Sequence, residues 1–294
     1  MFGALGTTLC FALTAVFANR AAQQLGSTLA NFYRLLLAVL ILGAWAHAAG
    51  LGLGGGALGW FFVSGLAGFG LGGVAMFQAL PRLGSSLAML LVQCGSVVVA
   101  AGLEWAWLGT RLTAMQSACI VLTLAGVALG LLPPSRPHAP PQVLRAGIGW
   151  AIVSAISQGA GAVLSRKAFA VAAAAHLHPD PATTAYQRAI GGLVVAVLAV
   201  ALARTARGEK SYSTLREMWP WVLANTLTGP VLGVTCYQWA LSTTPAGLVQ
   251  PIVATSPLAT IPLAALLERT WPRPLYYAGA VLAVAGVAGL YLTR

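Results

Sequence analysis

The sequence predicts an all-α integral membrane protein of ten transmembrane helices, arranged as two inverted repeats of five helices each. Hydrophobic residues make up 59% of the 294 residues and charged residues 7%, whereas soluble domains carry roughly 25% charged residues. The apolar runs are about 20 residues long, a length that lets a helix cross a bilayer. The two halves of the chain also share short motifs, which is typical of a duplicated unit. A water-soluble fold is therefore excluded.

The expected spans follow one another through short connections. They are apolar all round, unlike barrel strands, which alternate polar and apolar residues over about ten positions. Gly68 with Gly72, and Gly126 with Gly130, have the spacing that lets membrane helices approach closely. The ten expected ranges are 2–19, 28–49, 57–80, 84–108, 112–132, 147–170, 183–204, 218–241, 245–267 and 273–293.

One connection differs from the others because five prolines lie between Leu132 and Gln142. Proline cannot continue a helix and favours extended backbone, so this stretch is expected to be a linker. It divides the chain into a first repeat over 1–132, a Pro-rich linker over 133–146 and a second repeat over 147–294.

Short matches between the halves occur in the same order along the chain. They pair Arg20 with Arg166, Tyr33-Arg34 with Tyr186-Gln187-Arg188, Phe77-Gln78 with Tyr237-Gln238, Thr110-Arg111 with Glu268-Arg269, and Ala125–Ala128 with Ala285–Ala288. An odd number of spans per repeat places the second copy upside down relative to the first. Inverted repeats are the usual architecture of secondary transporters, because oppositely oriented halves can expose a midplane site to either side. The repeat therefore favours a transporter.

Lysine and arginine are more frequent on the membrane side opposite the two termini. Because an excess of these residues marks cytoplasmic connections, both termini are expected to face away from the cytoplasm. The formal net charge of +11 is attributed to this orientation and to lipid headgroups, since no basic run with interleaved aromatic residues indicates nucleic-acid binding. The expected partners are a small-molecule substrate and membrane lipids, with no nucleic acid, and the protein is expected to be a monomer.

Several short segments resemble a known family. They are the arginine early in the second span of each half, Arg34 and Arg188, the prolines of Gln250-Pro251 and Ser256-Pro257, and the ending Leu266-Leu267-Glu268-Arg269. On these residues the chain resembles the drug/metabolite transporter superfamily, and within it the ten-span exporters with two EamA-type domains. The resemblance covers essentially the whole chain. It implies a secondary transporter of the bacterial cytoplasmic (inner) membrane that moves small metabolites outward by alternating access, similar to bacterial exporters of amino acids, including aromatic ones.

Polar and aromatic side chains inside the spans are the candidates for a substrate cavity. A buried glutamine brings donors and an acceptor that need partners, and aromatic rings can wall in a substrate. The candidates are Gln78, Gln93, Gln158, Gln238, Gln250, Tyr237, Trp239, Phe77 and Trp150. Two alternatives stay open, hydrogen bonding between helices for the glutamines and a place in the interfacial belt for aromatic residues near span ends.

Prolines and carboxylates provide the remaining candidates. Prolines inside a span free backbone carbonyls and can act as hinges, with plain kinking as the alternative; the hinge candidates are Pro230, Pro251 and Pro257. Glu104 with Arg111, and Glu268 with Arg269, are expected to be ion pairs near the membrane interface. The family's Glu-Arg pair reads Thr110-Arg111 in the first half; Glu104, six residues earlier, is either the substitute for the missing glutamate or unrelated to it.

The first span contains no carboxylate that could carry a proton, whereas small four-span members of the superfamily resemble one another in keeping a glutamate there. Facilitated diffusion of a neutral or zwitterionic solute is therefore expected rather than proton-coupled export. A sugar or nucleotide-sugar carrier is the alternative within transport, and an intramembrane lipid-modifying enzyme is the alternative in another class. Because His, Asp and Glu are scarce in the spans, we expect no enzyme activity, no cofactor and no metal.

Overall fold

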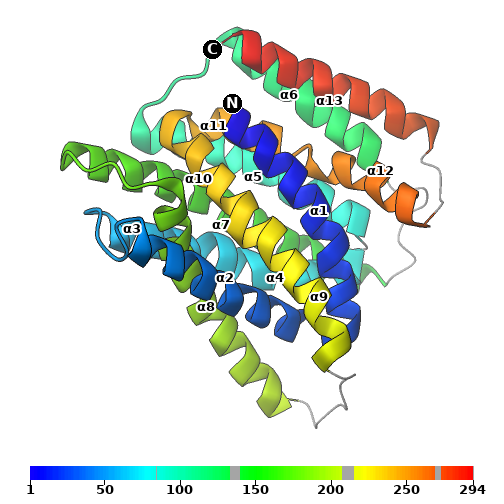
Figure 1. Cartoon of the computed structure of the whole chain (residues 1–294). Helices are drawn as coiled ribbons and strands as arrows, with labels where there is room; N and C mark the ends of the chain where they lie inside the picture. The colour runs from blue at the N-terminus through cyan, green and yellow to red at the C-terminus, as the bar shows by residue number, and fades with distance from the viewer. Residues whose placement is uncertain (84, 133–139, 207–214, 269–272, 294) are drawn as a thin grey trace.

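The computed structural model describes residues 1–83, 85–132, 140–206, 215–268 and 273–293, and these residues are almost entirely helical (Figure 1). The first repeat contains α1 (Phe2–Leu25), α2 (Ser27–Ala48), a run made of α3 (Leu58–Gly65), the π-helical segment η1 (Leu66–Leu71) and α4 (Gly72–Leu83), then α5 (Ser85–Leu108) and α6 (Ala114–Leu131). The second repeat contains α7 (Pro141–Ala174), α8 (Pro181–Ala206), a run made of α9 (Leu215–Thr226), the π-helical segment η2 (Leu227–Gly233) and α10 (Val234–Thr243), then α11 (Ala246–Val253), α12 (Ser256–Glu268) and α13 (Pro274–Leu292).

Each expected span falls on a helical run, which confirms the prediction of an all-α membrane protein. Within the described ranges, nine helical segments are long and apolar enough to cross a membrane. The eighth expected span, 218–241, is not among these nine and is the continuous run from α9 to α10. Both termini lie on the same side of the bundle (Figure 1), as an even number of crossings requires. We call that side the terminal face and the other side the opposite face.

The first helix of the second half, α7, begins earlier in the chain than expected. Pro140 is the N-cap residue of α7 and Pro141 is its first residue, so residues 141–146 are helical rather than part of a linker. Proline suits the first position of a helix, because its missing N–H has no intrahelical acceptor there and its φ is already helical. The rest of the expected linker, 133–139, lies outside the described residues.

The ninth span is two helices rather than one. α11 ends at Val253 and α12 begins at Ser256, with Ala254 and Thr255 in the turn between them. Pro257 has no N–H to donate to the Val253 carbonyl, and its ring would clash with that carbonyl in a continuous helix. The equivalent span of the first repeat, α5, contains no proline and is continuous.

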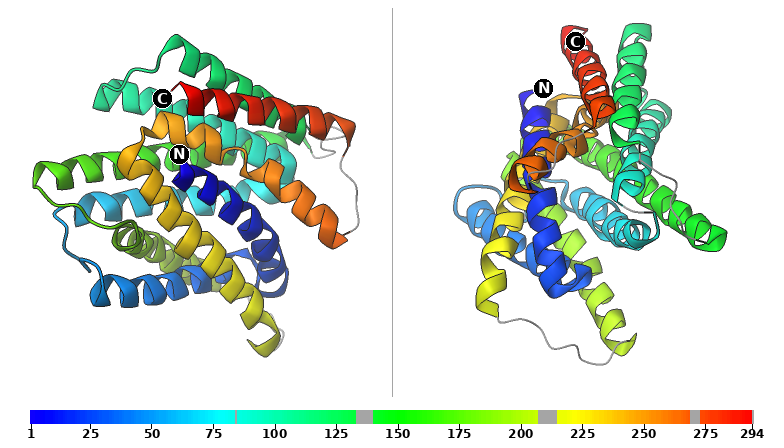
Figure 2. Two further views of the ribbon diagram at one scale, coloured as in Figure 1. Left: turned by 45° about the horizontal axis from the view of Figure 1, so that its top comes forward. Right: turned by 90° about the vertical axis from the view of Figure 1, so that its right-hand side faces the viewer.

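The contacts between helices follow the repeat. α1 packs against α9, η2 and α10, and its counterpart α7 packs against α3, η1 and α4. Similarly, α7 lies against α5, whereas α1 lies against α11 and α12. The pairs α2–α8 and α6–α13 join equivalent helices; α6 and α13 lie side by side (Figure 1) at one edge of the bundle (Figure 2). Exchanging the two repeats therefore maps these contacts onto one another.

Glycines bring α6 and α13 into backbone contact. A Cβ atom added at Gly126 would lie 2.6 Å from the carbonyl oxygen of Gly279, and one added at Gly286 would lie 2.7 Å from the backbone nitrogen of Thr123. Small residues at such contacts are the main device by which membrane helices pack closely. The close approach predicted at Gly126 is confirmed.

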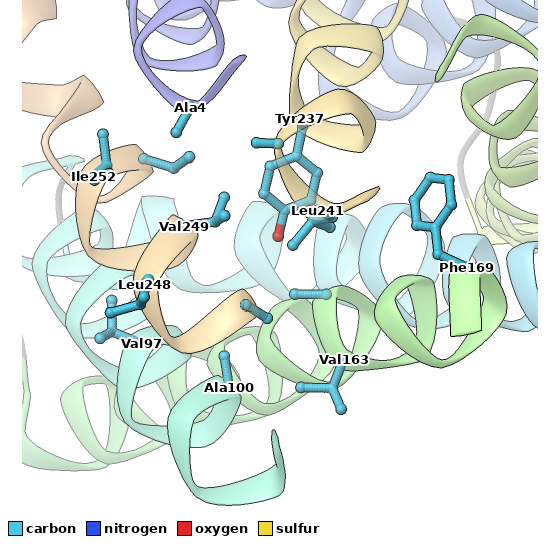
Figure 3. Close-up of a cluster of buried hydrophobic side chains, with 14 of the residues drawn as sticks. Ala4, Val97, Ala100, Val163, Phe169, Tyr237, Leu241, Leu248, Val249 and Ile252 are labelled. Atoms are coloured by element: carbon cyan, nitrogen blue, oxygen red, sulfur yellow. The ribbon is translucent and has the colours of Figure 1, made fainter. Parts of the chain in front are cut away.

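The largest hydrophobic core lies toward the terminal face and contains residues from both repeats (Figure 3). It joins the terminal-side ends of α1, α3, α5, α6, α7, α10, α11 and α13; Figure 3 shows Leu248 of α11 beside Val97 of α5. We call it the terminal-side core. It holds the two repeats together at that face.

Toward the opposite face, the buried apolar residues form separate smaller clusters. One lies between α1, α2 and α9, a second between α4, α5 and α7, and a third between α6, α12 and α13. A fifth cluster, with Leu42, Ala185 and Val234 at its centre, lies between α2, α8 and α10 beside the terminal-side core. Among the side chains that the structure describes, the largest shared core therefore lies near the terminal face, and three separate groups lie near the opposite face.

Candidate functional site

A chain of buried polar side chains joins four helices at the inner edge of the terminal-side core. Nη1 of Arg188 on α8 donates to Oε1 of Gln238 on α10 over 3.2 Å. The hydroxyl of Tyr237, also on α10, donates to Oε1 of Gln250 on α11 over 2.9 Å, and Nε2 of Gln250 donates to Oγ of Ser96 on α5 over 3.4 Å. All five side chains are at most 6% exposed. We call these five residues the polar chain.

Arg188 is held between two aromatic rings and the backbone of η1. Its guanidinium carbon lies 5.1 Å from the ring centre of Phe69 and 5.3 Å from that of Tyr237, within the range of cation–π attraction. Its Nη2 lies 2.6 Å from the position that a Cβ atom would take at Gly68, so only glycine leaves room for the guanidinium there. The first repeat therefore forms one wall around a charge that the second repeat supplies.

Arg34, the equivalent residue of the first repeat, faces η2 in the same way. Its backbone carbonyl accepts from the hydroxyl of Thr226 over 3.4 Å, and its Nη1 lies 3.8 Å from a Cβ position at Gly229 of η2. Each arginine thus faces the π-helical segment of the other repeat, and π segments inside α-helices frequently mark functional sites. Arg34 is partly exposed, whereas Arg188 is 4% exposed. Nε of Arg34 is nevertheless buried, like Nε of Arg188, and Nη2 of Arg34 donates to Oδ1 of Asn31 over 2.7 Å.

Glu104 does not pair with Arg111, which corrects the sequence prediction. Its Oε1 lies 3.5 Å from Nε of Arg166 on α7, and its Oε2 accepts from the backbone N–H of Gly247 in α11 over 2.7 Å. Gly109, with a φ of 70°, ends α5 and turns the chain, so Arg111 leaves the helix that carries Glu104. Arg111 is exposed, and among the described residues it forms no ion pair.

The second predicted ion pair cannot be placed in the same way. Glu268 is the last residue of α12, and its side chain is not among those described. Arg269 lies outside the described residues.

Gln93 contacts the polar chain through its backbone carbonyl, whereas the amides of Gln78 and Gln158 bond within their own helices. The hydroxyl of Ser96 donates to the backbone carbonyl of Gln93 over 2.9 Å. Oε1 of Gln78 accepts from Arg82 on its own helix over 2.9 Å. Nε2 of Gln158 donates to the hydroxyl of Ser154, which itself donates to the carbonyl of Gly72 on α4. Gln158 therefore belongs to the contact between α7 and α4.

Three aromatic candidates are not brought into the polar chain by any described contact. Trp150 and Trp239 are 39% and 50% exposed, and Phe77 is partly buried. Large exposed rings on membrane helices face lipid or the interface more readily than a shared polar site. Tyr237 is the aromatic candidate that the structure places in the chain.

The three proline candidates occupy interrupted helices. Pro230 lies buried in η2, whereas Pro251 and Pro257 stand on either side of the break in the ninth span. The carbonyl of Ile252 at this break accepts from the hydroxyl of Thr8 on α1 over 3.0 Å. A side chain of the first repeat thus binds a carbonyl of the interrupted span that also accepts from the N–H and the hydroxyl of Thr255, and the hinge role stays a prediction.

Sequence reasoning missed several residues of this region. Arg188 served there as a family marker and not as a site residue, although a charge seven positions into a span is itself a functional signal. Arg166 was noted only for its match to Arg20. Ser96 and Thr8 carry no signal in a single sequence, because hydroxyls are common in membrane helices and bond their own backbone.

Comparisons with known proteins agree with the fold and with the repeat. The EamA-like transporter family matches residues 1–132 and 145–292, so its pattern occurs once in each half. A solved crystal structure is similar over 98% of this chain and 96% of its own, with a TM-score of 0.74 and 20% sequence identity, and supports the fold alone. A comparison with curated proteins finds no match. The chain therefore belongs to the EamA-like transporter family and is a multi-pass membrane transporter of small molecules.

Proposed function

We propose that this protein exports amino acids across the bacterial cytoplasmic (inner) membrane by alternating access, as a monomer surrounded by lipids. The polar chain from Arg188 to Ser96 carries the proposal. Charged and amide groups are costly inside a bilayer and mark substrate pathways there. An amino acid offers a carboxylate, an ammonium group and a side chain, and the chain presents a guanidinium, two amides and aromatic surface within one buried region.

The uneven packing of the two faces supports alternating access. The terminal-side core and the Glu104–Arg166 ion pair join both repeats at one face, whereas separate clusters occupy the other. Because the repeats are equivalent and inverted, an exchange of their conformations would close the opposite face and open the terminal face.

The proposed driving force is the gradient of the substrate itself. Glu104, a carboxylate deep in the described part of the bundle, already binds Arg166 and the Gly247 N–H. Asp180, at the start of α8, accepts from the backbone N–H groups of Ala182 and Thr183. Both carboxylates are thus already engaged by groups of this chain, and neither belongs to the polar chain.

Uptake competition in liposomes tests the substrate class. The purified protein is reconstituted, and uptake of a labelled aromatic amino acid is measured against unlabelled amino acids, sugars and nucleotide sugars, beside protein-free vesicles. We expect saturable uptake that amino acids alone reduce. Competition by a sugar or nucleotide sugar, with none by amino acids, would contradict the proposed substrate class and indicate a sugar or nucleotide-sugar carrier.

A variant pair tests the site. Gln250→Leu removes the amide that links Tyr237 to Ser96 and is expected to slow uptake strongly. Gln142→Leu makes the same change at an exposed position in the first turn of α7 and is expected to leave uptake unchanged. Equal uptake rates for both variants in folded protein would show that the polar chain is not part of the transport pathway.

A further inference from the structure

Two buried hydrogen-bond donors of the polar chain lack an acceptor, and they belong to two side chains that are hydrogen-bonded to each other. Nε of Arg188 and Nε2 of Gln238 are both buried, and neither has a partner in the described part of the chain. The orientation of the Gln238 amide follows from its neighbour, because its Oε1 accepts from Nη1 of Arg188 and the flipped amide would place two donors together. Unpaired buried donors are costly, and a pair of them indicates a missing acceptor.

The positive charge of Arg188 is also unbalanced within the described residues. Glu104 is bound to Arg166 and Gly247, and Asp180 is bound to backbone N–H groups at the start of its own helix. The rings of Phe69 and Tyr237 face the guanidinium but carry no formal charge. A buried cation that lacks a carboxylate is strongly unfavourable, so the missing acceptor is expected to be an anion.

We infer that Arg188 and Gln238 bind the carboxylate of the transported solute, with the Arg188 Nε–H and the Gln238 Nε2–H as donors to it. This inference rests on the proposed function and deepens it, because it assigns the substrate class: organic solutes with a free carboxylate. A guanidinium matches a carboxylate in shape and charge. Phe69, Tyr237 and Gly68 hold it in one place before the solute arrives, which lowers the entropy lost on binding.

The first test uses chemically related competitors of wild-type uptake. An aromatic amino acid, its methyl ester and the corresponding decarboxylated amine share the ring and the ammonium group but differ in the carboxylate. We expect the acid to compete at least about tenfold better than either analogue, as the loss of a charge-assisted hydrogen bond predicts. Equal competition by all three would overturn the inference.

The second test places an anion inside the protein. Gln238→Glu puts a carboxylate beside the Arg188 guanidinium, where it would occupy the donors that the solute needs. We expect this variant to fold with an unchanged or higher melting temperature and to lose the preference for the acid. Arg188→Gln should lose the same preference, whereas Arg82→Gln, at an arginine that bonds Gln78 of its own helix, should keep it.

The outcomes separate this inference from the proposed function. If Arg188→Gln does not fold, the test rests on Gln238→Glu alone. Folded Gln238→Glu protein that still prefers the acid over its ester and amine analogues would overturn the inference. Thermal shift of detergent-solubilised protein by benzoate, compared with benzamide, reports carboxylate binding without any transport. A benzoate shift that Gln238→Glu abolishes, in a protein that takes up no amino acid, would refute amino-acid transport and keep the site. Amino-acid uptake without any preference for a carboxylate would support amino-acid transport and refute the carboxylate site at Arg188 and Gln238.

Discussion

Oε1 of Glu104 lies 3.5 Å from Nε of Arg166, which places an ion pair between α5 and α7 near the terminal face. Glu104 also accepts from the N–H of Gly247 in α11, and Arg166 donates to the carbonyl of Leu241 in α10 over 2.6 Å. Two side chains thus connect four helices from both repeats. Glu104 is 2% exposed, so this connection belongs to the packing that closes the terminal face. Its loss should therefore favour opening of that face.

The first prediction is that Glu104→Gln opens the terminal face. Removal of one partner of a buried pair leaves the other charge uncompensated, and that cost falls on the closed arrangement. In a variant without the four native cysteines, a membrane-impermeant maleimide should label Val249→Cys, at a core position that is 1% exposed, about tenfold faster when Glu104→Gln is present, which corresponds to about 1.4 kcal/mol. Arg111→Gln should leave the labelling rate unchanged, and an equal rate in Glu104→Gln would contradict a closing role for the ion pair.

The second prediction concerns the glycine beside Arg188. A Cβ atom at Gly68 would lie 2.6 Å from Nη2 of Arg188, whereas one at Gly73 would meet nothing within 4 Å. Gly68→Ala should therefore displace the guanidinium and reduce amino-acid uptake, while Gly73→Ala should leave uptake intact and raise stability by up to about 1 kcal/mol through helix propensity. Initial uptake rates and melting temperatures of both variants check this. Normal uptake by Gly68→Ala would show that the position of Arg188 does not matter for transport.

The third prediction concerns the contact between α6 and α13. Gly126→Ala places a methyl group against the backbone of α13, with the Gly279 oxygen 2.6 Å away, and overpacking of this kind costs about 1–3 kcal/mol. We expect a lower melting temperature in detergent. Gly102→Ala is the control, because a Cβ atom there meets nothing within 4 Å. An unchanged melting temperature of Gly126→Ala would mean that α6 and α13 can move apart at this position without a cost in stability.

The fourth prediction concerns the hydrogen bond that joins α10 to α11. Tyr237→Phe keeps the ring beside Arg188 but removes the donor to Gln250, which leaves a buried amide oxygen unpaired at a cost of about 1–3 kcal/mol. The melting temperature should fall, and uptake should fall with it. Tyr291→Phe, at a position on α13 that is 54% exposed, should change neither. A stable Tyr237→Phe protein with normal uptake would contradict the role given to this bond.

Much of the fold could be predicted because its signals are local or periodic. Long apolar runs fixed the spans, matched motifs revealed the repeat, and the spacing of Gly126 and Gly130 predicted a close helix contact. The break at Ala254–Thr255 was signalled by Pro257. The early start of α7 was not recognised, since a run of prolines was read as a linker although Pro141 suits the first helical position.

The π-helical segments could not be predicted from the sequence. η2 contains Pro230, but η1 contains no proline at all, so no shared residue signals them. Only the structure shows them, at equivalent places between α3 and α4 in the first repeat and between α9 and α10 in the second.

The candidate site was only partly predictable because its contacts join distant parts of the chain. Gln238, Tyr237 and Gln250 could be selected as polar groups within spans, and the structure places all three in the polar chain. Glu104 could not be paired correctly, since Arg166 reaches it through the packing of α7 on α5. The amide oxygen of Gln78 accepts a hydrogen bond from Arg82 one helical turn away. This oxygen therefore needs no partner from a cavity.

Counterflow across liposomes tests the central claim, transport by alternating access driven by the substrate gradient, most directly. Reconstituted protein is loaded with unlabelled amino acid, and uptake of the labelled amino acid is followed with and without an imposed pH gradient. The account predicts saturable uptake that internal substrate accelerates and that the pH gradient does not change. Flux that rises linearly with concentration and ignores internal substrate would identify a channel, and accumulation above equilibrium driven by the pH gradient would identify proton coupling; either result would contradict the account.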